Sequence, residues 1–106
     1  MLVTDIGQGM AEELNLGVSG AHYGWPHREG TFVTNRTNER IVYPLSADDV
    51  IHGYTYPVAQ YGHDEGNSTR LTAITGGSVY RGSTLPALIG QYILGDMVTG
   101  GASTYR

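Results

Sequence analysis

Three neighbouring polar residues, His63, Asp64 and Glu65, have the side-chain types of a proton-transfer cluster. A histidine changes its charge near neutral pH, and an adjacent carboxylate can hold or accept its proton. The three residues lie between Gly62 and Gly66. A second interpretation is therefore a solvated loop whose polar side chains cap turns. Both interpretations remain open from the sequence alone.

Other reactive patterns are weaker. His22, His27 and His52 do not have the spacing of a zinc site, and the chain has no cysteine to supply a thiolate, a disulfide or a Cys nucleophile. Thr75-Gly76-Gly77 matches no phosphate-binding pattern. No serine stands in a nucleophile-elbow motif, so hydrolase chemistry has no support.

The elements that must position these residues are short strands. An apolar run at Leu2 and Val3 ends at Asp5, and residues 13–18 alternate acid or amide with aliphatic side chains, which is typical of a half-buried strand. Between them, Gly7 predicts a tight turn that needs a positive φ, with Gln8 on the surface. Further strand-like segments lie at 41–44, 54–61, 73–82, 91–96 and 102–106.

Composition agrees with an all-β chain. Sixteen of the 106 residues are glycine and only 15% are charged, as expected for short strands joined by Gly-rich turns. The net charge is −4 and the six arginines are scattered, so nucleic acid is not an expected partner. No apolar run is long enough for a membrane span, and no signal peptide is recognisable at Met1.

An internal repeat relates the two ends of the chain. Residues 2–18 and 93–106 each show an apolar strand that ends in an aspartate, Asp5 or Asp96, followed by a Gly-rich hairpin. The two aspartates are 91 positions apart, about twice the length of a propeller blade, so they stand either two blades apart or one blade apart with an insertion. We prefer the second interpretation, with residues 27–56 as the insertion. Both aspartates are expected to close turns at strand ends.

A series of motifs resembles the glucose/sorbosone dehydrogenase family, whose members are six-bladed β-propellers. The resemblance covers nearly the whole chain, and residues 31–53 carry least of it. The motifs are Asp5-Ile6-Gly7-Gln8, Glu12-Glu13-Leu14-Asn15-Leu16, Tyr23-Gly24-Trp25-Pro26, Glu29-Gly30, Pro57-Val58, Tyr61-Gly62-His63-Asp64-Glu65-Gly66, Thr75-Gly76-Gly77, Val79-Tyr80-Arg81-Gly82, Pro86-Ala87-Leu88, Gly90, Tyr92 and Gly95-Asp96.

The resemblance implies that residues 1–106 are a fragment of such a propeller, with the end of one blade, most of the next, antiparallel strands and long loops. It implies a parent enzyme that transfers hydride from a sugar to pyrroloquinoline quinone (PQQ) in the periplasm or outside the cell. Main-chain carbonyls of Gly7 and Gln8 would bind Ca²⁺, and Gly7, Gln8, Thr75 and Gly76 would contact the cofactor.

The resemblance assigns no catalytic residue here, because the family's histidine base lies in an earlier blade. Gly101 stands where the family usually has arginine. The alternative function is a non-catalytic propeller module that binds a protein or a carbohydrate. Tyr23 and Trp25 are expected to pack their loop against the blade, the other interpretation being that they stack on a sugar or quinone ring.

Overall fold

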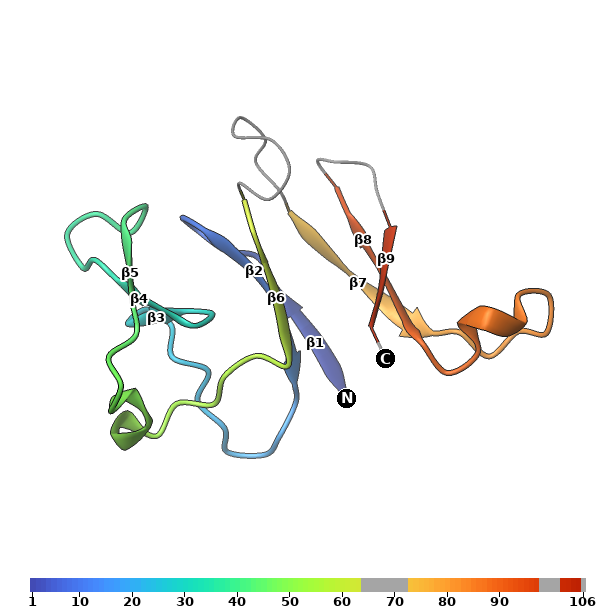
Figure 1. The fold of residues 1–106 in the computed structure, drawn as a ribbon, viewed down its shortest axis with the longest axis horizontal. Coiled ribbons are helices and arrows are strands. Elements are labelled where there is room, and N and C mark those ends of the chain that lie inside the picture. Colours follow the sequence, from blue (N-terminus) through green and yellow to red (C-terminus); the bar gives the residue numbers. More distant parts are fainter. Residues whose placement is uncertain (64–72, 98–101, 106) are drawn as a thin grey trace.

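The computed structural model describes residues 1–63, 73–97 and 102–105. Within these residues the fold is all-β, as predicted, and all strand pairs are antiparallel. The strands form three open sheets of three strands each and no closed barrel (Figure 1). The helical elements described are two 3-10 segments, η1 (Asp49–His52) and η2 (Pro86–Leu88), and neither is long enough to cross a membrane.

The three sheets follow one another along the chain, except that sheet A is completed only after sheet B. Sheet A has the order β1-β2-β6, sheet B β3-β4-β5 and sheet C β7-β8-β9. The strands are β1 (Leu2–Asp5), β2 (Ala11–Leu16), β3 (Arg28–Glu29), β4 (Phe32–Thr34), β5 (Val42–Pro44), β6 (Ala59–Gly62), β7 (Ile74–Val79), β8 (Tyr92–Asp96) and β9 (Ala102–Tyr105).

The main core lies between sheets A and C, which stand side by side in Figure 1 with β1 next to β7. Leu14 from β2 packs with Ile74, Tyr92 and Leu94 from sheet C, and all four are less than 9% exposed. Burying such side chains is the main source of stability for sheets of this size. The residues packed around this cluster are Leu2, Ala59, Tyr61, Val79 and Tyr105.

Polar contacts fix the relative position of these two sheets. The fully buried Glu12 on β2 accepts a hydrogen bond from the Ile74 backbone N–H at 2.8 Å through Oε2. The Tyr61 hydroxyl on β6 donates to Asp96 on β8 at 2.7 Å. Burial, followed by the nearby Asp96 carboxylate, raises the pKa of Tyr61 far above its ordinary value. Asp96 therefore connects strands, in agreement with its expected place at a strand end.

Sheet B arises from residues that lie between β2 and β6 in the sequence. A buried ion pair holds it to η1: Arg28 Nη2 lies 2.6 Å from Asp49 Oδ1. The hydrogen bonds from Arg28 and from the Tyr56 hydroxyl lower the pKa of Asp49. The predicted strand over 54–61 is shortened to β6, because the Thr55 backbone N–H donates to His22 O instead of to a strand.

Candidate functional site

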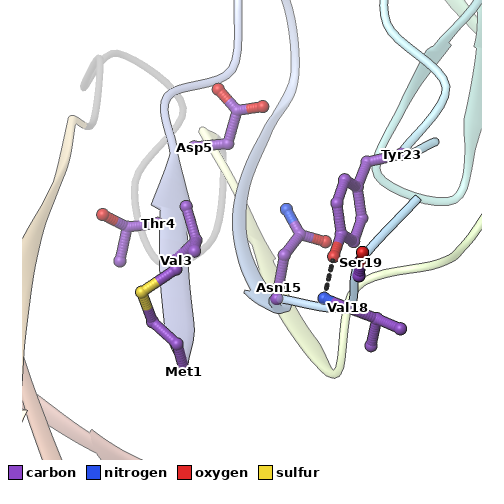
Figure 2. A pocket seen from close by; sticks show the side chains of 9 residues that line it. Met1, Val3, Thr4, Asp5, Asn15, Val18, Ser19 and Tyr23 are labelled. Atoms are coloured by element: carbon purple, nitrogen blue, oxygen red, sulfur yellow. Dashed lines mark hydrogen bonds between the residues drawn. The ribbon is translucent and has the colours of Figure 1, made fainter. Parts of the chain in front are cut away.

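One face of the β1–β2 hairpin points away from sheet C and carries polar side chains. In the antiparallel register Val3 pairs with Asn15, and Asp5 pairs with Glu13. Because side chains alternate between the faces of a strand, these four share one face while Leu2 and Leu14 occupy the other. Figure 2 shows Asn15 lying between Val3 and Asp5 on one side and Tyr23 on the other.

Two adjoining pockets lie on this face, and we refer to them together as the outer groove. Asp5 and Tyr23 line both pockets and so connect them. The larger pocket, of about 590 Å³, is also lined by Met1, Val3, Thr4, Asn15, Gly17, Val18 and Ser19. The smaller pocket, of about 230 Å³, is also lined by Ile6, Gly7, Gln8, Glu13, Trp25 and Glu29.

The turn that closes the hairpin is organised by a carboxylate from sheet B. Glu29, only 1% exposed, accepts the backbone N–H groups of Gly9, Met10 and Ala11 at 3.0, 2.6 and 2.7 Å. A Cβ on Gly7 would lie 1.9 Å from the Ala11 carbonyl oxygen and 2.6 Å from Glu29 Oε1. Glycine is needed here because of close approach. The expectation of a positive φ at Gly7 is wrong, since Gly7 is not among the described positive-φ residues.

Glu13 is also held by groups of the chain itself. One of its oxygens accepts the Gly30 backbone N–H, and the other accepts Asn15 Nδ2 at 3.0 Å. Burial, together with the charges of Asp5 and Glu29, raises the pKa of Glu13 above 4.5. Both Glu13 and Glu29 therefore serve mainly to hold the hairpin against sheet B.

Asp5 is the carboxylate that faces the open part of the groove. Its side chain is more exposed than those of Glu13 and Glu29 and lies where the two pockets meet. Burial raises its pKa above 3.8, and the nearby Glu29 charge adds to the shift. The charged form of Asp5 is thus less favourable than it would be in water, and a ligand that donates a hydrogen bond to this carboxylate would stabilise it.

Tyr23 and Trp25 behave differently, although they lie in one loop. The Tyr23 hydroxyl donates to Leu16 O at 2.5 Å and accepts the Val18 N–H at 3.0 Å, so Tyr23 does pack the loop against the hairpin (Figure 2). Trp25 remains 46% exposed beside the smaller pocket. Its ring is available to a ligand.

The four predicted cofactor residues lie in two separate parts of the fold, the turn between β1 and β2 and the strand β7. Gly7 and Gln8 line the smaller pocket, whereas Thr75 and Gly76 lie on β7 and line neither pocket of the outer groove. Within the described residues, no three His, Asp or Glu side chains converge as a metal site would need. PQQ contact by these four residues and carbonyl ligation of Ca²⁺ by Gly7 and Gln8 stay untested predictions. Gly101 lies outside the described residues.

His63 is neither solvated nor in the outer groove. Its ring is buried, and Nε2 lies 2.6 Å from Glu12 Oε1 between sheets A and C. The expectation of a solvated His63 side chain is therefore wrong, because the ring is buried against the Glu12 carboxylate. Asp64 and Glu65 lie outside the described residues, so the predicted cluster as a whole has no structural test.

Three residues of the groove escaped the sequence analysis as site residues: Glu13, Asn15 and Glu29. The alternation over 13–18 did place Glu13 and Asn15 on one face, which was the available signal. Glu13 is held by the Gly30 N–H next to sheet B, and Asn15 in turn donates to Glu13, so their roles depend on a contact between distant residues. Glu29 lies 20 residues from Gly9, and nothing in the local sequence announces this contact.

Comparison with known proteins identifies two similar plant proteins. The chain is 31% identical to the HIPL1 protein of Arabidopsis thaliana over 108 residues, covering 94% of this chain and 14% of that protein. It is 32% identical to the HIPL2 protein of the same plant over 97 residues, covering 91% of this chain and 13% of that protein. The chain thus spans only about a seventh of these relatives. No protein-family model and no solved structure matches.

These relatives overturn the predicted family. They are HIPL proteins and not sugar dehydrogenases, and no family model supports a PQQ-dependent enzyme. Assignment to the glucose/sorbosone dehydrogenase family is therefore wrong, as are the dehydrogenase function and the oxidoreductase class. The structure explains how the motifs misled: Gly24 and Gly30 have φ values of 103° and 55°, so these motif glycines serve loop geometry. Loop geometry does not specify a reaction.

Proposed function

We propose that the chain is part of a non-catalytic carbohydrate-binding protein and that the outer groove receives the sugar. The observation that carries the proposal is the position of the Asp5 carboxylate, at the junction of the two pockets and near an exposed tryptophan ring, Trp25. A few well-placed polar groups beside an aromatic surface are the usual features of a small-molecule site.

The chemistry of the groove favours a ligand rich in hydroxyl groups. Asp5 supplies acceptor oxygens, and its raised pKa means that the carboxylate gains from a hydrogen-bond donor. A sugar brings several hydroxyl donors in a small volume. It also presents an apolar C–H face, for which the Trp25 ring offers a matching flat surface.

Binding is favoured over hydrolysis by the roles of the neighbouring acids. Glycoside hydrolysis ordinarily needs two carboxyl groups that flank the bond to be broken. In the groove, Glu29 accepts three backbone N–H groups, and Glu13 accepts Gly30 N–H and the Asn15 amide. These two acids are committed to the fold, which leaves Asp5 to contact a ligand.

The proposal includes a finer description of the fold: sheets A and C would be adjoining blades of a six-bladed propeller, with 27–56 inserted in the first. Three features support this description: the strands of both sheets are antiparallel, the two sheets share one apolar core, and β1 lies next to β7. A periplasmic or extracellular location belongs to the same proposal, because it would expose the groove to free and polymeric sugars.

The single tryptophan of the chain makes the proposal testable by fluorescence. Titration with glucose, galactose, xylose and arabinose is expected to change Trp25 emission saturably for at least one sugar. Asp5→Asn should weaken that sugar about tenfold, because it replaces a charged acceptor by a neutral amide. Asp48→Asn, the same change at an exposed site outside the pockets, is the matched control.

Two results would contradict the proposal. One is unchanged Trp25 emission and no binding heat with all four sugars. The other is equal affinity of the wild-type chain and the Asp5→Asn variant for a sugar that does bind.

A further inference from the structure

The larger pocket of the outer groove contains a buried acceptor with no donor. Asn15 is 3% exposed and lines this pocket, and its Oδ1 has no hydrogen-bond partner. Buried polar atoms are nearly always paired in folded proteins, because an unpaired one loses its hydrogen bond to water and gains nothing. Oδ1 itself has almost no exposed surface, so a ligand's donor reaches this acceptor only when a side chain at the pocket wall shifts, as is common on binding.

The orientation of the Asn15 amide follows from its neighbour. Nδ2 donates to Glu13 Oε2 at 3.0 Å, and the other Glu13 oxygen accepts Gly30 N–H. An ionised carboxylate can only accept, so the amide must turn its NH₂ group to Glu13. Oδ1 is then the atom without a donor, and Figure 2 shows the side chain between β1 and the loop that carries Tyr23.

The rest of this pocket suits the ring of a second sugar unit. Val3, 41% exposed, and Val18, 55% exposed, give it apolar walls that can contact a C–H face. Asp5 and Tyr23 border this pocket and also the smaller one with Trp25. A ligand lying against Trp25 can therefore continue past Asp5 to reach Asn15.

We infer that the ligand of the outer groove is an oligosaccharide of at least two units, and that Asn15 Oδ1 accepts a hydroxyl hydrogen bond from the second unit. This inference rests on the proposed carbohydrate-binding function. It adds the minimum length of the ligand and the side chain that selects for length. Trp25 and Asp5 would hold the first unit, and the larger pocket would hold the next.

The test compares single sugars with their dimers by calorimetry on the full chain. Cellobiose against glucose and xylobiose against xylose are the probes, and at least one dimer is expected to bind about tenfold more tightly. Asn15→Leu should remove most of this advantage, measured as the ratio of dimer to single-sugar affinity within the variant. Thr34→Val is the control, because Thr34 Oγ1 is also buried without a partner but lines none of the described pockets.

A second variant keeps the test decisive if Asn15→Leu fails to fold. Val3→Phe fills the larger pocket from a half-exposed strand position and leaves Asn15 and Glu13 in place. It too should reduce dimer affinity to that of the single sugar. Equal binding of single sugars and dimers to the wild-type chain overturns the inference alone, as does a dimer advantage that survives in Asn15→Leu or Val3→Phe. Absence of binding to every sugar overturns the proposed function itself.

Discussion

Strand β2 buries side chains on both of its faces, but by different means. Leu14 on the inner face is 2% exposed, and Asn15 and Glu13 on the outer face are 3% and 6% exposed. Leu14 needs only apolar neighbours of suitable shape, which sheet C supplies. Every polar atom of the outer face needs its own hydrogen-bond partner instead. The outer-face acceptor without one, Asn15 Oδ1, is the atom on which our proposal of a second sugar unit rests.

The largest loss of stability is expected for a substitution on the inner face of the hairpin, which packs against sheet C. Leu14→Ala should destabilise the chain by about 3 kcal/mol, because it leaves a cavity in the core between sheets A and C. Urea unfolding followed by circular dichroism measures the loss. Val3→Ala, on the outer face of the same hairpin, is expected to change stability by less than about 0.5 kcal/mol. Similar losses for the two variants would show that the inner face does not dominate stability.

A smaller loss of stability is expected when the carboxylate that binds the hairpin turn, Glu29, is replaced by an amide. Glu29→Gln should cost about 2 kcal/mol, because the N–H groups of Gly9, Met10 and Ala11 lose a charged acceptor. The same unfolding experiment applies. Glu39→Gln affects an exposed ion pair with Arg36 and serves as the control, with a change near zero. A Glu29→Gln variant as stable as the wild type would mean that the turn does not depend on this carboxylate.

The charge of Asp5 should make stability fall as pH rises. Its native pKa lies above 3.8, so the native chain binds more protons than the unfolded chain between these two values. The favourable contribution is complete below 3.8 and is lost as pH rises through the raised pKa. Asp5→Asn should remove this slope and gain about 0.5 kcal/mol at neutral pH, a figure already reduced for solvent screening.

Unfolding midpoints measured at several pH values test this directly. The wild-type chain and Asp5→Asn should diverge towards neutral pH and converge in acid. Asp48→Asn should run parallel to the wild type throughout. A midpoint difference between wild type and Asp5→Asn that does not vary with pH would contradict the assigned cause.

The sequence predicts the inner face of the hairpin correctly, but it predicts the outer face only in part. Alternation over 13–18 correctly indicates a strand with Leu14 on one side and Asn15 on the other, and the all-β fold follows from composition. The role of Glu29 depends on a contact across the chain that no local pattern contains. Sheet B, which lies between β2 and β6 in the sequence, likewise forms through contacts that no local pattern contains. The strand predicted over 54–61 is reduced to β6, because the Thr55 N–H donates to His22 O in a preceding loop.

Function was least accessible, because the motifs that suggested it are made largely of residues with structural roles. Gly7 permits a close backbone approach, and Tyr23 ties its loop to the hairpin. Such residues recur wherever the same turns are built, whatever the chemistry of the protein. The residues that we assign to a ligand, Asp5, Asn15 and Trp25, stand within the same motifs, and nothing in the sequence distinguishes them from their structural neighbours.

The smallest change in stability is expected for Thr34, a residue with an unpaired buried oxygen that lines neither pocket of the outer groove. Thr34 on β4 is 4% exposed and its Oγ1 lacks a partner, as does Asn15 Oδ1. Thr34→Val keeps the branched shape that suits a strand and removes the unpaired oxygen, so stability should rise by about 0.5 kcal/mol. Sugar affinity should stay unchanged, since Thr34 lines neither pocket of the outer groove. If Thr34→Val instead weakened sugar binding, an unpaired buried oxygen would no longer distinguish the groove from the rest of the fold.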